Sequence, residues 1–152
     1  MSSAALTNGE YRALADLRYE LRRFLRFSER AARSAGLEPH QHQLLLALKG
    51  MPDGTHATIG LLAERLQIEH HSAGELVDRM AARDLVRRVR GEDDRRRVHV
   101  ELTARGDELL ALLSVFHRAE LRSVTPTLWR ALGALHATKH RAQSLLGGHR
   151  SA

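Results

Sequence analysis

The chain has 152 residues, of which 43% are hydrophobic and 28% are charged, a composition typical of a folded domain and not of a disordered segment. It contains no cysteine, which excludes disulfides, thiolate metal ligands and a cysteine nucleophile. No apolar run approaches the roughly 20 residues that a membrane span requires, and the N-terminus lacks the pattern of a signal peptide, so we expect a cytoplasmic protein.

The net charge of the chain is +6, with 24 Lys and Arg residues, all of which except Lys49 and Lys139 are arginine. The planar guanidinium group matches the geometry of phosphate, and a strongly basic protein favours a polyanionic partner such as nucleic acid. The alternative is that a genome rich in G and C raises the arginine content of every protein that it encodes.

The first part of the chain predicts two helices. The segment 10–34 contains no Gly or Pro, and its apolar residues recur at three- and four-residue spacings, which indicates one long helix. Gly36 ends it. A second helix is expected over 40–50, entered through Pro39, and the segment 51–57 after it is expected to be a loop or one short strand.

The next segment predicts two short helices in succession. Thr58 is the expected N-cap of the first. The second occupies about residues 69–83 and turns its apolar side chains to one face. A turn of about three residues separates the two helices, which is typical of a helix-turn-helix.

The hydrophobic period then changes to the two-residue period of a strand. Residues 85–90 and 97–102 are predicted strands, and the polar residues 91–96 between them form the exposed tip of a hairpin. Thr103 is expected to cap a helix that runs toward residue 120. Thr125-Pro126 is expected to start a separate last helix.

These elements predict a fold that is mainly α with a small β-hairpin wing: a winged helix-turn-helix flanked by long dimerisation helices. We expect a single domain over 1–152, in which 37–102 form the winged-helix DNA-binding region and 10–36 and 103–147 are mainly dimerisation helices. Apolar faces on such long helices need a partner, and a second copy of the chain supplies it most simply.

Several motifs follow one another in the order and spacing of a known family. They are Leu62-Ala-Glu-Arg-Leu-Gln-Ile68, Leu76-Val-Asp-Arg-Met80, Arg83-Asp-Leu-Val-Arg-Arg88, Asp94-Arg-Arg96 and Leu102-Thr-Ala-Arg-Gly106. Together they resemble the MarR family of bacterial transcription regulators, over nearly the whole chain. The resemblance implies a homodimer held by the first and last helices, recognition of a near-palindromic duplex and, often, release by a small anionic or phenolic ligand.

Two segments carry the candidate DNA-binding residues. The N-terminal end of the recognition helix can bind phosphate through its free N–H groups. A guanidinium at the hairpin tip can enter the minor groove, and Arg96 matches the family position for that contact. Glu75 repels phosphate, but it can accept a hydrogen bond from cytosine or pair with a nearby arginine. The full set is His70, His71, Ser72, Gly74, Glu75, Arg88, Arg90, Arg95, Arg96 and Arg97.

The candidate effector site consists of Tyr19, Phe27 and His42. His42 matches a family position that usually holds an aromatic residue, and its spacing from Leu45 turns it toward the first helix. A partly buried imidazole that titrates near neutral pH can donate to a carboxylate or phenolate, so we expect an aromatic or anionic ligand. The alternative is a core histidine bonded to a backbone carbonyl, and it stays open.

The main expectation is a repressor that a small ligand releases from DNA, and two other functions are possible. The ten histidines allow a metal-responsive regulator, since His136 and His140 share one helical face. Without Cys or a recognisable zinc-sensor cluster, we nevertheless expect no metal site and no cofactor. A winged helix can also serve as a protein–protein interaction module. Enzyme activity is not expected, because the sequence has no Gly-rich phosphate loop, nucleophile elbow or paired-carboxylate motif.

Overall fold

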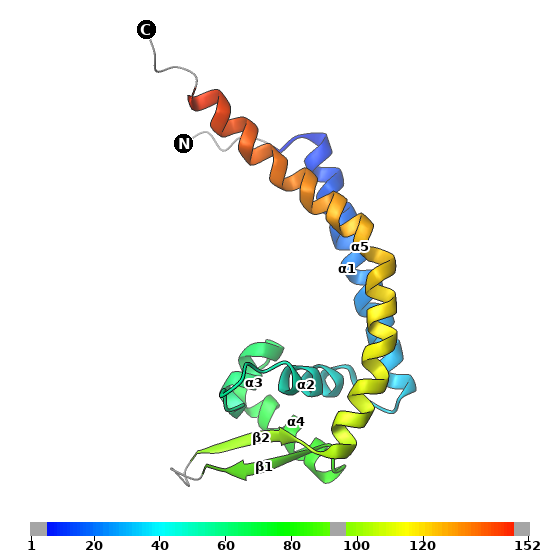
Figure 1. The fold of residues 1–152 in the computed structure, drawn as a ribbon, viewed down its shortest axis with the longest axis vertical. Coiled ribbons are helices and arrows are strands. Elements are labelled where there is room, and N and C mark those ends of the chain that lie inside the picture. The colour runs from blue at the N-terminus through cyan, green and yellow to red at the C-terminus, as the bar shows by residue number, and fades with distance from the viewer. Residues whose placement is uncertain (1–5, 92–96, 148–152) are drawn as a thin grey trace. The chain divides into compact units, whose positions relative to one another are not determined.

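The structure is a computed structural model that describes residues 6–91 and 97–147. Within these ranges the chain forms helices and one antiparallel hairpin in the predicted order (Figure 1). The elements are α1 (Asn8–Ser34), α2 (Pro39–Lys49), α3 (Ile59–Leu66), α4 (His70–Ala82), β1 (Val86–Arg90), β2 (Val98–Leu102) and α5 (Ala104–Gly147). The predicted fold class, a mainly α-helical chain with a winged helix-turn-helix, is confirmed.

The chain divides into two units. One is continuous, Ser28–His117, and contains the whole winged helix together with the end of α1 and the start of α5. The other combines Met1–Phe27 with Arg118–Ala152, so its described part consists of the remaining lengths of α1 and α5. None of the described helices combines the length and the apolar character that crossing a membrane requires.

Local side-chain bonds set where the short helices begin and end. The hydroxyl of Thr58 accepts a hydrogen bond from the N–H of Leu61 at 3.3 Å, so the predicted N-cap of α3 is confirmed. Gln67 ends α3 in the left-handed region, with φ of 55°. Pro39 occupies the first turn of α2, where its missing N–H has no partner to lose. The predicted loop at 51–57 contains no strand.

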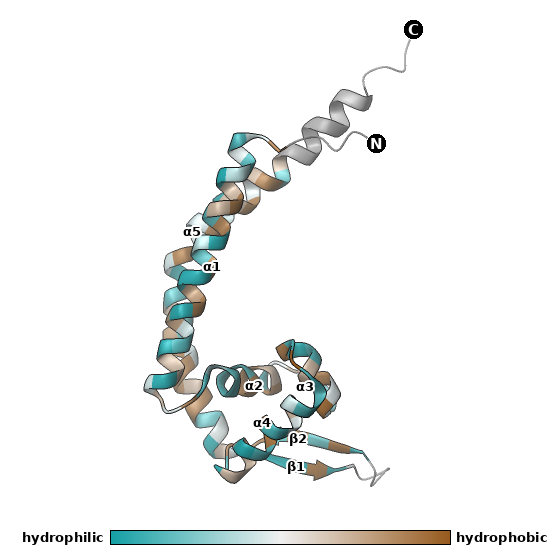
Figure 2. Ribbon diagram, turned by 180° about the vertical axis from the view of Figure 1, so that it is seen from behind, coloured by the Kyte–Doolittle hydropathy of each residue, from teal (hydrophilic) through white to brown (hydrophobic). Residues whose placement is uncertain are grey.

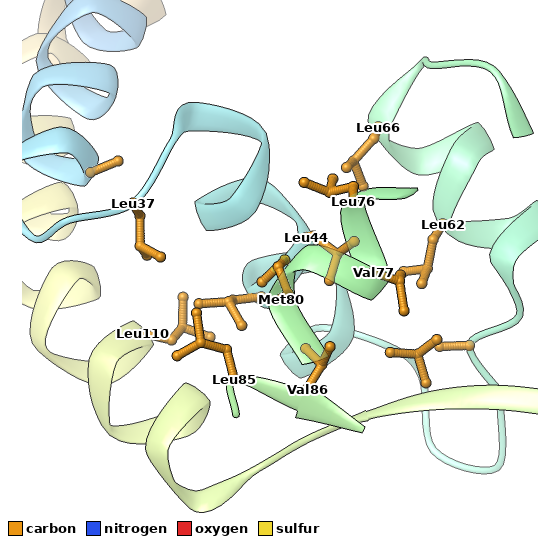
Figure 3. Packing of buried hydrophobic residues seen from close by; sticks show 14 of the residues in the cluster. Leu37, Leu44, Leu62, Leu66, Leu76, Val77, Met80, Leu85, Val86 and Leu110 are labelled. Carbon is orange, nitrogen blue, oxygen red and sulfur yellow. The ribbon is translucent and has the colours of Figure 1, made fainter. Parts of the chain in front are cut away.

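The core of the Ser28–His117 unit joins α2, α3, α4, both strands and the start of α5 (Figure 3). Leu44, Leu62, Val77 and Met80 have 0% exposure, and burying a side chain of this size stabilises the fold by about 1.5–3 kcal/mol. Because α4 supplies two of these residues, the core holds α4 by one face and leaves its other face outside.

The C-terminal helix differs from the prediction. α5 is continuous over Ala104–Gly147 with Pro126 inside it, so the separate helix expected to start at Thr125-Pro126 was wrong. Pro126 removes one backbone donor, but the hydroxyl of Thr125 donates to the Leu121 carbonyl at 2.6 Å in the preceding turn. The buried side chains of Val124 and Ala131 lie on either side of the proline, and packing outweighs the local preference for a break.

Candidate DNA-binding and effector sites

The recognition helix α4 presents its predicted contact residues on one side. His70, His71 and Glu75 are exposed, and Ser72 and Gly74 are half-buried. The opposite side is the core face, made of Ala73, Leu76, Val77 and Met80. The 3.6-residue period of the sequence therefore identified the free side of α4 correctly, although contact of these side chains with DNA stays a prediction.

Nothing within the protein requires a glycine at position 74. A Cβ added at this position would have no atom within 4 Å among its neighbours, so neither packing nor backbone conformation requires glycine. A glycine inside a helix lowers its stability by about 1 kcal/mol relative to alanine. The space that Gly74 leaves open is on the half-exposed side of α4, where another molecule can approach the backbone.

The hairpin pairs β1 with β2 in register, with Arg88 opposite Val100. Arg88 turns toward α4: its Nη2 lies 2.7 Å from Oδ1 of Asp78 and its Nε lies 3.1 Å from the same atom. A phosphate contact by Arg88 would therefore compete with the Asp78 carboxylate. Arg90 and Arg97 are exposed.

The predicted minor-groove residues Arg95 and Arg96 lie outside the described residues. The alternative partner expected for Glu75 is present: its Oε2 lies 3.9 Å from Nη1 of Arg79, and both side chains are well exposed. An exposed ion pair of this length contributes about 0–1 kcal/mol, so it leaves Glu75 able to change partner.

The start of α5 explains the Leu102-Thr-Ala-Arg-Gly106 motif. The hydroxyl of Thr103 accepts from the N–H of Gly106 at 3.1 Å, which confirms Thr103 as the N-cap. Thr103 also donates to the Asp84 carbonyl at 2.6 Å. A Cβ at Gly106 would overlap the carbonyl oxygen of Leu85, so glycine lets α5 approach the entry to β1. The motif thus fixes the wing to α5.

Arg83 follows the last turn of α4. In the sequence it was named only as the first residue of a family motif, with no role assigned to it. Its Nη1 donates to Oε1 of Gln41 at 2.9 Å, and its Nη2 donates to the carbonyl of Gly36 at 2.9 Å. The partners are 42 and 47 residues away in the chain, and no local spacing pattern signals contacts over such separations.

His42 is buried, with 3% exposure, and stacks on His117 with ring centroids 4.5 Å apart. Its Nε2 has no hydrogen-bond partner among the described residues. Burial, and secondarily charge repulsion from His117, lower the pKa of His42 from 6.5 to about 4. The expectation that this imidazole titrates near neutral pH was therefore wrong, because burial disfavours the charged ring.

His117 was missed, and it has the backbone bond expected for His42. Its Nδ1 lies 2.7 Å from the Leu113 carbonyl, and its Nε2 lies 2.7 Å from Oγ of Ser28. A carbonyl can only accept, so Nδ1 donates to Leu113, and Nε2 shares its hydrogen bond with the Ser28 hydroxyl, which can either donate or accept. A histidine on a predicted helix rich in leucine was the available sequence signal.

Tyr19 and Phe27, the other predicted effector residues, belong to the other unit. Tyr19 is 62% exposed, and the guanidinium carbon of Arg23 lies 5.9 Å from the centre of its ring. Phe27 is half-buried. As for metals, the described residues contain no group of three or more His, Asp or Glu side chains placed to hold an ion.

The winged-helix unit also contains open cavities. The larger, of about 770 Å³, has residues of α1, α2 and α4 in its walls, among them Gln41, Ser72 and Arg79. A smaller one of about 290 Å³ lies where the loop before α3 meets β2, beside His56 and His99. A molecule in the larger cavity would touch the recognition helix directly.

Comparisons with known proteins agree with this geometry. Residues 35–97 match the model of the MarR family. AbsC, a MarR family transcriptional regulator from Streptomyces coelicolor, is 26% identical with a TM-score of 0.68, over 95% of this chain and 99% of that chain. No curated protein matches the sequence.

Two further solved structures share the fold. A mutant of MepR from S. aureus, bound to an oligodeoxyribonucleotide, is 21% identical with a TM-score of 0.58, over 93% of this chain and 99% of that chain. BpsR from Bordetella bronchiseptica, whose DNA binding is regulated by 6-hydroxynicotinic acid, is 21% identical with a TM-score of 0.59, over 87% and 91%.

Proposed function

We propose that the protein is a repressor of the MarR family that binds a near-palindromic operator and that a small aromatic or anionic ligand releases. The match of residues 35–97 to the model of that family supports this proposal. The observation that carries the proposal is the free polar side of α4, which is held on the core by its other face and stands beside an arginine-bearing hairpin.

In this proposal, α4 enters the major groove with its N-terminal end. His70, His71 and Ser72 contact bases or phosphates there, because free N–H groups and polar side chains lie together at that end. Gly74 allows close approach of the helix backbone. Arg90 and Arg97 contact phosphates at the base of the hairpin, together with Arg88 when phosphate replaces its bond to Asp78.

At the hairpin tip, Arg96 enters the minor groove with Arg95 beside it. A narrow minor groove has an enhanced negative potential that attracts guanidinium groups. In the sequence, Arg95 and Arg96 lie between the paired strands β1 and β2, and this place in the chain supports the proposal.

We propose a homodimer as the DNA-binding form. α1 and α5 carry large exposed apolar side chains, and Figure 2 shows apolar positions recurring along both helices. Among the side chains that the structure describes on these helices, the most exposed are Tyr11, Tyr19, Leu25, Leu112, Val115, Phe116 and Trp129. Such a surface is typical of an interface. Two winged helices related by a twofold axis would place half-site centres about 34 Å apart, one turn of the duplex.

For the effector, we propose an aromatic acid or phenolate that contacts His42. The unpaired Nε2 of His42 supports this, because a buried polar atom without a partner destabilises the free protein and gains from a ligand that supplies one. The low pKa of His42 means that the neutral ring would make the contact at neutral pH. The acid named for BpsR is of this chemical class.

The test begins with selection of duplexes from a random library by the wild-type protein. We expect enrichment of an inverted repeat and a dimer in sedimentation at micromolar concentration. On the selected duplex, Arg96→Ala should weaken binding by about 1–3 kcal/mol and reduce the salt slope by about one per subunit, whereas Arg150→Ala should change neither. A folded monomer that enriches no sequence would refute the proposal.

A further inference from the structure

Arg83 joins three elements at one point of the winged-helix unit. It is the first residue after the last turn of α4. Its guanidinium donates to the carbonyl of Gly36, in the turn between α1 and α2, and to the side chain of Gln41, in the first turn of α2. Both distances are 2.9 Å, which is short enough for charge-assisted hydrogen bonds.

The acceptor on Gln41 is itself held in place. Oε1 of Gln41 accepts from the backbone N–H of Glu38 at 3.0 Å as well as from Arg83. Two donors on one oxygen fix which end of the amide is the carbonyl, and the side chain is only 7% exposed. The end of α4 is therefore fastened to the N-terminal cap of α2 and not to a mobile surface group.

The acceptor on Gly36 depends on backbone conformation. Gly36 has φ of +77°, a left-handed conformation that glycine adopts without strain, and it directs its carbonyl toward Arg83. Only a planar fork of donors can reach this carbonyl and the Gln41 amide together. Lysine has one compact ammonium on a flexible stem, so it would keep the charge without the double contact.

We propose that Arg83 is a positioning residue for DNA recognition: it fixes the C-terminal end of α4 to the α1–α2 turn and so sets the direction in which α4 is presented. The proposal rests on the proposed function, since it assumes that α4 reads DNA. A movement of the α1–α2 turn would reach the recognition helix through the same two bonds.

α4 is long enough that a small rotation at its C-terminal end displaces its N-terminal end. α4 has 13 residues and is therefore about 20 Å long. A tilt of about 5° about its C-terminal end would move the N-terminal end, with His70 and His71, by roughly 2 Å. Hydrogen bonds to base edges tolerate only a few tenths of an ångström, so a small loss of alignment at Arg83 becomes a loss of base contacts at the other end.

The test measures operator affinity over a range of salt concentrations for wild type and Arg83→Lys, with Arg105→Lys as an exposed control. We expect Arg83→Lys to bind about tenfold more weakly with an unchanged salt slope, and the control to match wild type. A slope reduced by about one per subunit would instead identify Arg83 as a phosphate contact and overturn the proposal. Unchanged affinity would overturn it too.

A second variant guards against a purely structural effect. Gln41→Met removes the oxygen that accepts the hydrogen bond from Arg83. If both residues act through this bond, a protein with both substitutions should bind the operator no more weakly than whichever single variant binds it less tightly. All measurements are made well below the melting temperature. A lower melting temperature with unchanged affinity for each variant would show that Arg83 only stabilises the fold.

Hydrogen exchange on the free protein separates this proposal from the proposed function. Arg83→Lys should speed amide exchange at residues 35–38 and at the last turn of α4, whether or not the protein binds DNA. If wild type binds no duplex, the proposed function fails, and the exchange result still decides whether Arg83 couples these segments. Unchanged exchange at both would refute the coupling.

Discussion

The buried ring of His42 makes the stability of the protein depend on pH in a calculable way. Its pKa in the folded protein is about 4, against 6.5 for an ordinary histidine. Below about pH 6.5 the unfolded chain binds a proton at this ring that the folded chain does not bind, so stability falls as the pH falls. The loss from His42 is roughly 2 kcal/mol between about pH 7.5 and pH 5, and roughly 3 kcal/mol in full.

The assay is chemical denaturation of wild type and His42→Phe at both pH values and one protein concentration. Other groups titrate in the same range, so the informative quantity is the difference between the two proteins. We expect the acid-induced drop in unfolding free energy to be smaller by roughly 2 kcal/mol in His42→Phe. His40→Phe changes an exposed histidine of the same helix and should show the drop of the wild type.

The same variant tests the unpaired nitrogen. Phenylalanine keeps a ring to stack on His117 and removes the buried Nε2 that lacks a partner, so His42→Phe should be no less stable than wild type at about pH 7.5. Equal acid-induced losses in wild type and His42→Phe would mean that His42 is not a buried neutral ring, and the argument for its free nitrogen as a ligand contact would fall with it.

Three further substitutions have expected outcomes, of which the one at Gly74 also rests on the proposed function. Gly106→Ala should lower the free energy of unfolding by about 1–3 kcal/mol or more, measured by denaturant melts, because its Cβ would overlap Leu85. Gly74→Ala should raise helix stability by up to about 1 kcal/mol and weaken operator binding in fluorescence anisotropy; stronger or equal binding would contradict close approach. Thr103→Ala should destabilise by about 0.5–2 kcal/mol through loss of the N-cap.

The fold was largely predictable because its signals are local. The N-caps at Thr58 and Thr103 and the two-residue period of the hairpin each lie within a few residues of the structure that they specify. Pro126 misled because proline is common at the first turn of a helix, and the sequence offers no local sign that the helix has already begun. Burial of Val124 and Ala131 on either side of Pro126 favours a continuous helix. Burial depends on the tertiary structure, so the local sequence does not reveal it.

The candidate sites were predictable only in part, for the same reason. Periodicity identified the free side of α4, but it could not show that Arg88 bonds to Asp78. The contact of His117 with Ser28 spans 89 residues, and those of Arg83 span more than 40. Contacts of this kind join segments that the fold brings together, so spacing along the chain does not reveal them.

The electrostatics of the hairpin follow from these pairings more than from the arginine content. Arg87 lies 2.8 Å from Glu101, and its hydrogen bond to that carboxylate is the largest cause of the lowered pKa of Glu101. Arg88 is paired with Asp78 in the same manner. A phosphate that binds either guanidinium must displace a carboxylate. The loss of that ion pair offsets part of the free energy gained from the phosphate contact. The number of phosphates that one subunit binds, read from the salt slope, should therefore fall well below its number of basic residues.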